Sequence, residues 1–327
     1  MAGATQSTNQ PAVPTPIGIA ESSFVHDRIV PLLRYMRRNR LLVVGIAAIA
    51  ALILTVTITY MFYSQDNLYD EPTGVSEMAK ELSAFPEIRP SWNPWGEFPL
   101  GTDPQGRDIY AGLMVGAPLT LRVGLIAAAI GVGVGLVLAF VAAYAGGWVD
   151  SVVRVIVDSL IPIPGLLIVV LVATAINPGK GISVDQMAFV ISVLAWPGPA
   201  RVIRSQVLVM RERGYVEMAR MSGTSPLGII FKEMIPNLTP YILASFVASV
   251  SGAILATVGL EALGLGPADD STLGRMIYLN IFYGTVLHGL WWWLVAPIAV
   301  LVVLFVGLFM ISAGLDEVAN PRLRRRV

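Results

Sequence analysis

The chain has 327 residues, of which 55% are hydrophobic and 13% are charged, and its formal net charge is zero. Globular domains carry about 25% charged residues, so this composition excludes an ordinary water-soluble domain and predicts an all-α polytopic membrane protein. The balanced charge gives no sign of a nucleic-acid partner. Because the chain has no cysteine and only two histidines, we expect no disulfide framework, no thiol nucleophile and no His-rich metal site.

The first predicted membrane span follows a polar N-terminal tail, residues 1–40. Residues 41–63 carry no charge over 23 positions, and a helix of that length spans about 34 Å, enough to cross a bilayer. The run is too long for the apolar part of a signal peptide, so we expect no cleavable signal. The tail contains five Lys/Arg, which marks it as cytoplasmic.

The segment 64–116 is predicted to lie outside the cell. It holds nine acidic residues and only three basic ones. Asp103 and Pro104 can begin a short interfacial helix with Leu113 and Met114 on its apolar side. We expect this helix to lead into the next span.

Residues 117–315 are predicted to contain five further spans. These are residues 117–144, 151–176, 185–201, 238–260 and 291–313. In the first of them, Gly131 and Gly135 form a face that another helix can approach closely. Pro162 and Pro164 can kink the second, and Trp196 with its following prolines interrupts the third. A cytoplasmic tail, residues 316–327, ends the chain.

Three ionisable residues share one helical face at the start of the span 151–176. Asp150, Arg154 and Asp158 stand at i, i+4 and i+8, the spacing of neighbours on a helix surface. Ionisable residues in a span are candidates for function. Because these lie near the inner end, we interpret them as a structural charge cluster in preference to a proton relay.

The distribution of basic residues orients the six predicted spans. Segments 1–40, 201–236 and 322–326 carry five, six and four Lys/Arg, whereas segments 64–116, 177–184 and 261–290 carry three, one and one. Six spans with both termini in the cytoplasm therefore satisfy the positive-inside rule.

The loop 201–236 contains a polar helix–turn–helix between two apolar spans. Residues 215–222 can form two helical turns, and Gly223 suits the position just past a helix end. Ser225 is a predicted N-cap, with Pro226 at the first helical position. Pro236 is expected to end this second helix at the residue before it. The charges of the loop place it in water or against another protein.

This loop resembles the cytoplasmic coupling loop of ATP-binding-cassette importer permeases. Glu217, Ala219, Gly223 and Pro236 match that family's spacing, with Met218 in place of an alanine. In the family, the short helix docks on an ATPase subunit. The resemblance therefore implies a mechanical role, not catalysis. The residues to which it assigns ATPase coupling are Tyr215, Glu217, Ala219, Arg220, Gly223, Thr224, Ser225 and Pro236.

A wider resemblance covers residues 99–323 and points to the second permease subunit of dipeptide, oligopeptide and nickel importers. Its motifs are Pro99-Leu100-Gly101-Thr102-Asp103, Gly146-Gly147 with Asp150, Arg154 and Asp158, Ala200-Arg201 with Arg204, Glu261 with Leu263-Gly264-Leu265-Gly266, and Asn320-Pro321-Arg322-Leu323. The resemblance implies a type I importer transmembrane domain in the plasma (inner) membrane of a prokaryote. It also implies four kinds of partner: a homologous permease subunit, two ATPases, an extracellular or periplasmic substrate-binding protein, and membrane lipid.

Two features depart from the pattern of peptide importers and point to an alternative substrate. The Trp291–Trp293 run, interpreted as an interfacial anchor, and the Leu315-Asp316-Glu317 tail are similar to family members that serve oligosaccharide importers. Peptides and oligosaccharides therefore both stay open as substrates.

The chain lacks the G-x-x-x-x-G-K-[ST] nucleotide-binding motif. We therefore expect no ATPase activity and no cofactor on this chain, with ATP and Mg²⁺ on the partner ATPases. An ion-coupled secondary transporter is the alternative of another class, but carboxylates in the middle of a span and an internal repeat, its usual signs, are lacking. A membrane-embedded enzyme needs a polar constellation within the spans, which the sequence does not supply.

Overall fold

The computed structural model describes residues 39–62, 90–92, 98–103, 107–176, 182–267 and 270–319. Within these ranges the chain is helical apart from connecting turns and an isolated antiparallel bridge between Thr102 and Asp108. The helices in chain order are α2 (Arg40–Phe62), α5 (Ile109–Ala145), α6 (Gly147–Leu160), α7 (Gly165–Ile176), α8 (Val184–Ala195), α9 (Pro197–Arg211), α10 (Gly214–Met221), α11 (Pro226–Gly228), the π-helix η2 (Ile229–Met234), α12 (Ile235–Ala262), α13 (Leu273–Phe282) and α14 (Trp291–Ala319). The predicted N-terminal tail, most of segment 64–97 and the closing arginines lie outside the described residues.

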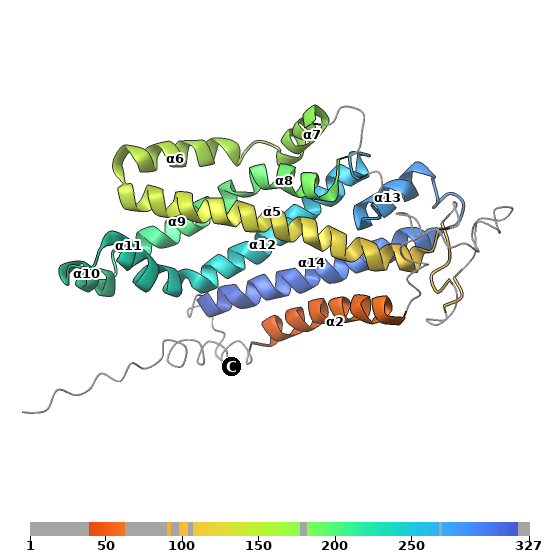
Figure 1. Ribbon diagram of the computed structural model, residues 1–327, viewed down its shortest axis with the longest axis horizontal. Coiled ribbons are helices and arrows are strands. Elements are labelled where there is room, and N and C mark those ends of the chain that lie inside the picture. Colours follow the sequence, from red (N-terminus) through yellow and green to blue (C-terminus); the bar gives the residue numbers. More distant parts are fainter. Residues whose placement is uncertain are drawn as a thin grey trace, which may run out of the picture.

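The long helices form a bundle whose length matches a membrane. Among the described residues, four helical stretches are long and apolar enough to cross one, namely α2, α5, α11 to α12, and α14. Two bent pairs, α6 with α7 and α8 with α9, bring the number to six if each pair is one span. Figure 1 shows α10 and α11 at one end of the bundle and α13 at the other. The all-α membrane fold is confirmed.

The first and last spans pack tightly against each other. A Cβ atom on Gly45 would lie 2.7 Å from the Gly307 carbonyl oxygen, so α2 and α14 touch through backbone. At the end of this seam, the Asn39 amide donates to the Gly314 carbonyl at 3.2 Å and to the Glu317 carboxylate at 2.6 Å. Residues 39 and 317 therefore lie together, at the same end as α10 (Figure 1).

Helix α5 begins earlier than expected, and the separate interfacial helix is wrong. Asp108 caps α5 by accepting from the Tyr110 N–H at 2.8 Å, and the helix runs without a break to Ala145. Leu113 and Met114 are buried in the core instead of facing an interface. The physical reason is packing: a Cβ on Gly116 would lie 2.7 Å from the Ser271 carbonyl oxygen, because the loop before α13 rests on this turn. The boundary at residues 116/117 thus falls inside a helix.

The two bent pairs have different angles. Helices α6 and α7 meet at 87° across residues 161–164, where Pro162 and Pro164 lie. The predicted kink is therefore a full break between two helices. Helices α8 and α9 meet at 43° at Trp196. Gly131 and Gly135 of α5 contact this second joint, since added Cβ atoms would lie 2.5 Å from the Ala195 Cβ and 2.9 Å from the Ala200 nitrogen.

Pro236 does not end a helix, contrary to expectation. Residues 226–262 form one helical rod through α11, η2 and α12. The π-helical turn of η2 widens the backbone just before Pro236, and the Ile235 N–H donates to the Ile230 carbonyl, five residues back. The Asn237 side chain donates to the Glu233 carbonyl at 2.6 Å. These two bonds serve the carbonyls on either side of Phe231 and Lys232, the residues whose carbonyls face the missing N–H of Pro236.

The segment 261–290 contains a helix that the sequence analysis did not predict. Helix α13 begins at Thr272, whose hydroxyl accepts from the Arg275 N–H at 3.3 Å. The tryptophan run is only partly an interfacial anchor: Trp291 is exposed, but Trp293 is buried, and its ring stacks on Tyr283 with centroids 6.3 Å apart. Helix α14 continues to Ala319, so the tail boundary at residue 316 lies inside it.

Candidate functional site

The polar hook, residues 214–234, is a compact turn between α9 and α12. Helix α10 ends at Met221, and Gly223 follows with φ of +77°, a conformation that glycine adopts without strain. The Gly223 N–H donates to the Arg220 carbonyl at 3.1 Å, and the Thr224 N–H donates to the Ala219 carbonyl at 3.1 Å. These two bonds form a Schellman motif. The glycine stop is as predicted.

The second half of the hook begins at Ser225, two residues after Gly223. The Ser225 hydroxyl accepts from the Gly228 N–H at 3.2 Å, and Pro226 occupies the first helical position. The predicted cap is therefore present. Only two residues, Thr224 and Ser225, separate the left-handed glycine from the next helix, so the two halves of the hook are rigidly joined.

The base of the hook is buried in the bundle. Val216, Ile229 and Met234 are almost fully inaccessible and pack with α5 and α9 in one apolar cluster. Arg211, at the end of α9, donates to the Ala143 carbonyl of α5 at 2.9 Å. Burial of each such side chain contributes about 1.5–3 kcal/mol. The hook is therefore packed firmly onto the spans beneath it.

The tip of the hook, the surface turned away from the bundle, exposes apolar side chains next to charged ones. Met221, Leu227 and Phe231 are 75%, 66% and 64% exposed. Glu217 and Arg220 are exposed beside them. Of the other residues that the resemblance assigned to coupling, Tyr215 and Ala219 pack against the base, Gly223, Thr224 and Ser225 form the turn, and Pro236 lies beyond the hook in the rod.

The charge cluster is held together across helices and not along α6. Asp150 receives two hydrogen bonds from the Arg204 guanidinium of α9, at 2.5 and 2.6 Å. Asp158 lies 3.9 Å from the Arg201 guanidinium. Arg154, between the two carboxylates on α6, forms no ion pair within 4 Å among the described residues. Arg201 and Arg204 of α9 are thus members of this cluster. The sequence analysis counted them among the cytoplasmic basic residues and the motifs of the resemblance, but did not pair them with α6.

The bent helices enclose two pockets beside this cluster. One, of about 160 Å³, is lined by Arg154, Asp158, Arg201 and Arg204. The other, of about 290 Å³, is apolar. Its lining residues are Gly165, Leu166, Val169, Ile191, Leu194, Ala195, Gly198, Pro199, Ser249, Gly252, Ala253 and Ala256. Both pockets include the start of α9, since Pro199 lines the apolar one and Ala200 lines the charged one.

Comparison with known proteins supplies the family. Residues 131–325 match the model of the binding-protein-dependent transport system inner membrane component. The chain belongs to this family. It is 33% identical to the dipeptide transport system permease protein DppC of Bacillus subtilis over 239 residues, 73% of this chain and 72% of that protein. It is 30% identical to the oligopeptide transport system permease protein OppC of Lactococcus lactis subsp. cremoris over 292 residues, 89% of this chain and 94% of that protein.

The matched range places the hook and the charge cluster within the family domain. It begins at Gly131, inside α5, and contains every helix from α6 to α14. Helix α2 precedes it. The resemblance to an importer permease, stated from the loop and its flanking motifs, is confirmed by this match and by the relatives.

One further carboxylate of this permease is almost fully buried. Glu261, 1% exposed at the end of α12, accepts from the Thr272 hydroxyl at 2.7 Å. Cβ atoms on Gly266 and Gly274 would collide with the Glu261 side chain, so the two glycines form its slot. The residue ties the rod to the start of α13 and is interpreted as structural.

Proposed function

We propose that this chain is one of two permease subunits of an ATP-driven importer for di- and oligopeptides. Each subunit supplies half of the translocation pathway. Two ATPase subunits bind ATP and Mg²⁺ and dock on the hooks. A substrate-binding protein delivers the peptide on the opposite side. The N- and C-termini lie in the cytoplasm.

The observation that carries this proposal is the hook, with its buried base and exposed apolar tip. Charged Glu217 and Arg220 exclude insertion of the tip into lipid. The exposed Met221, Leu227 and Phe231 form an apolar surface with a charged rim, which is typical of a protein–protein docking site. Because the base packs against α5 and α9, displacement of the tip is transmitted to the spans.

The positions of the hook, the chain ends and α13 along the bundle support the same orientation in the membrane. The hook lies at the end of the bundle where residues 39 and 317 meet, and α13 lies at the other end (Figure 1). The basic residues of segment 201–236 favour the cytoplasm for the hook. Helix α13 and residues 98–103 and 107–108 then face outward, where a binding protein docks.

Peptides are favoured over oligosaccharides as the substrate. The relatives that cover the greater part of this chain are named as dipeptide and oligopeptide permeases. The tryptophan run that suggested oligosaccharide importers has a packing role here, because Trp293 belongs to the core and stacks on Tyr283.

The test is coupled transport by the complete importer in liposomes. Addition of ATP should drive peptide uptake, and Glu217→Ala should lower the number of peptides transported per ATP hydrolysed. Glu212→Ala is the matched control, because Glu212 is an exposed carboxylate that precedes the hook and pairs with Arg211. Uptake driven by a proton gradient without ATP would instead identify a secondary transporter. If the Glu217 variant transports as many peptides per ATP hydrolysed as the wild type, the hook does not couple ATP hydrolysis to transport.

A further inference from the structure

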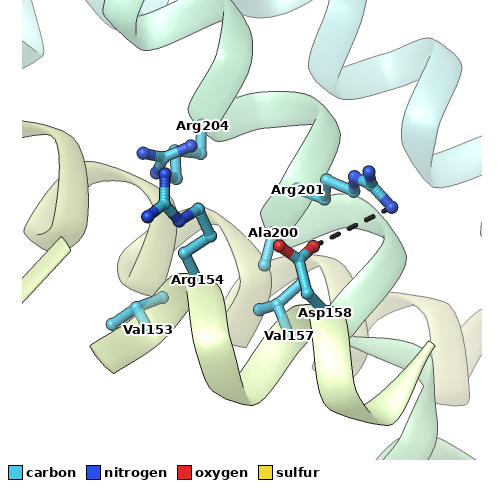
Figure 2. Close-up of a pocket in the computed structure, with 7 residues that line it drawn as sticks. All are labelled: Val153, Arg154, Val157, Asp158, Ala200, Arg201 and Arg204. Carbon is cyan, nitrogen blue, oxygen red and sulfur yellow. Dashed lines mark ion pairs between the residues drawn. The ribbon is translucent and has the colours of Figure 1, made fainter. Parts of the chain in front are cut away.

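The seam between α6 and α9 contains a pocket with an unbalanced charge. Figure 2 shows Arg154 and Asp158 reaching into it from one helix and Arg201 and Arg204 from the other. Asp150 is engaged by two hydrogen bonds from Arg204, and Asp158 is paired with Arg201. Three guanidinium groups thus face two carboxylates, and one positive charge is left in excess.

The excess charge resides on Arg154. Its position between Asp150 and Asp158 favours ion pairs along the helix, but in the described part of the chain neither carboxylate comes within 4 Å of it. Both are drawn toward α9 instead. In Figure 2 the Arg154 side chain points toward Arg204, away from Asp158. The arrangement lacks one anion.

The charges on this face of the bundle disfavour contact with the apolar interior of a membrane. Arg154, Asp158 and Arg201 are exposed on helices of the two bent pairs that pass the membrane-span test, and exposed charges are expensive in a bilayer. Broken helices are tolerated at membrane depth only where they are buried in protein or line a water-filled cavity. The 87° break between α6 and α7 adjoins the apolar pocket, whose lining includes Gly165 and Leu166.

We propose that the Arg154 pocket binds the C-terminal carboxylate of a peptide as it passes through the permease. This inference rests on the proposed function. A guanidinium matches a carboxylate with two parallel hydrogen bonds, and about 160 Å³ accommodates that group with adjoining backbone. A permease that serves peptides of many sequences can recognise only what they share, and every unmodified linear peptide carries a terminal carboxylate. The apolar pocket, whose lining is mainly apolar, can hold side chains of different peptides. Because Arg154 is exposed, the contact is weak enough to release the peptide.

The first test uses the fact that the chain has no cysteine. Val153→Cys places a single thiol on the pocket wall of this subunit. The complete importer, without ATP and in neutral lipid, is treated with an anionic and a cationic methanethiosulfonate, and labelling of this chain is read by mass spectrometry. We expect the anionic reagent to react faster. In the Arg154→Gln background this preference should fall by about two- to five-fold, the factor that corresponds to one exposed ion pair. A free-acid tripeptide should slow labelling, whereas the same tripeptide with a C-terminal amide should not.

Three results would overturn the proposal. Equal rates for the two reagents would show that the pocket has no excess positive charge. Protection by added anionic lipid but not by free-acid peptide would identify a lipid headgroup as the ligand. An unreactive thiol would show that a partner subunit covers the pocket. None of these measurements requires transport, so ATP-driven peptide uptake can persist while this inference fails.

The second test measures transport of the free-acid and the amidated peptide by the same importer. The ratio of the two uptake rates is compared between the wild type and Arg154→Gln. Any preference of the binding protein for the free acid or the amide affects both importers equally, so it cancels when the two ratios are compared. We expect the ratio to fall by about two- to five-fold, to be restored in part by Arg154→Lys, and to stay unchanged in Arg40→Gln, which removes an exposed arginine from α2. An unchanged ratio in Arg154→Gln would contradict the proposal.

Discussion

Adding one methyl group at Gly131 should force α5 away from the joint between α8 and α9. In Gly131→Ala the new Cβ would lie 2.5 Å from the Ala195 Cβ and 2.9 Å from the Ala195 carbonyl carbon. Carbon atoms prefer separations of about 3.5–4.0 Å, so the helices must part by about 1 Å. No rotamer change can relieve the clash, because the opposing atoms are backbone and Cβ. Overpacking of this kind costs about 1–3 kcal/mol.

Gly133→Ala is the matched control on the same helix. A Cβ at Gly133 meets nothing within 4 Å among the described residues. Both substitutions gain the same helix propensity, about 0.5–1 kcal/mol, and this gain cancels when the two variants are compared. Gly131→Ala should therefore be less stable than Gly133→Ala by about 1–3 kcal/mol.

The assay is equilibrium unfolding of the purified protein in bicelles by titration with dodecyl sulfate. Ala195→Gly, added to Gly131→Ala, removes the shortest contact but leaves the backbone atoms, so it should restore part of the lost stability. The double variant then shows non-additive free energies, as expected for residues in contact. If Gly131→Ala is as stable as Gly133→Ala, α5 does not touch this joint through Gly131, and the packing described here is wrong.

Three further substitutions test the cluster, the hook and the buried carboxylate. Asp150→Asn weakens two hydrogen bonds to Arg204 and should lower the free energy of unfolding by about 1–3 kcal/mol. The Asp150→Asn/Arg204→Gln double variant should lose less than the sum of the two single losses, and strictly additive losses would contradict the coupling of the two residues. Gly223→Ala puts a side chain at a φ of +77°, at a cost of about 1–2 kcal/mol, and should lower the transport-to-ATPase ratio of the importer, with an unchanged ratio as the opposing result. Glu261→Ala removes the acceptor of the Thr272 hydroxyl and should speed amide hydrogen exchange in α13, whereas unaltered exchange would show that this bond does not hold the helix.

Local features of the fold could be predicted because they depend on neighbours in sequence. An uncharged run of 23 residues predicted α2 to within one residue at each end. Gly223 and Ser225 predicted the stop and start within the hook, since a left-handed glycine and a hydroxyl cap act over only a few residues. Gly131 and Gly135 predicted a close helix contact, and the contact exists.

Features that depend on distant residues were missed. The first turns of α5 pack under the loop before α13, whose Ser271 lies against Gly116 from more than 150 positions away. Asp150 and Asp158 were assigned to a cluster on one helix, but their partners are on α9, and helical spacing cannot identify a partner on another helix. Pro236 was expected to stop a helix, and a π-helical turn with the Asn237 side chain accommodates it.

Because the helix continues through Pro236, the second half of the hook and the fifth span form one continuous helical rod. Residues 226–262 make 37 positions of helix, a shaft of about 55 Å at 1.5 Å per residue. A tilt of about 5° at one end sweeps the other by about 5 Å over such a length. Because the Glu261 carboxylate accepts from the Thr272 hydroxyl at the start of α13, a displacement of the tip near Leu227 would be carried along the rod to α13, to the extent that the π-helical turn before Pro236 does not bend.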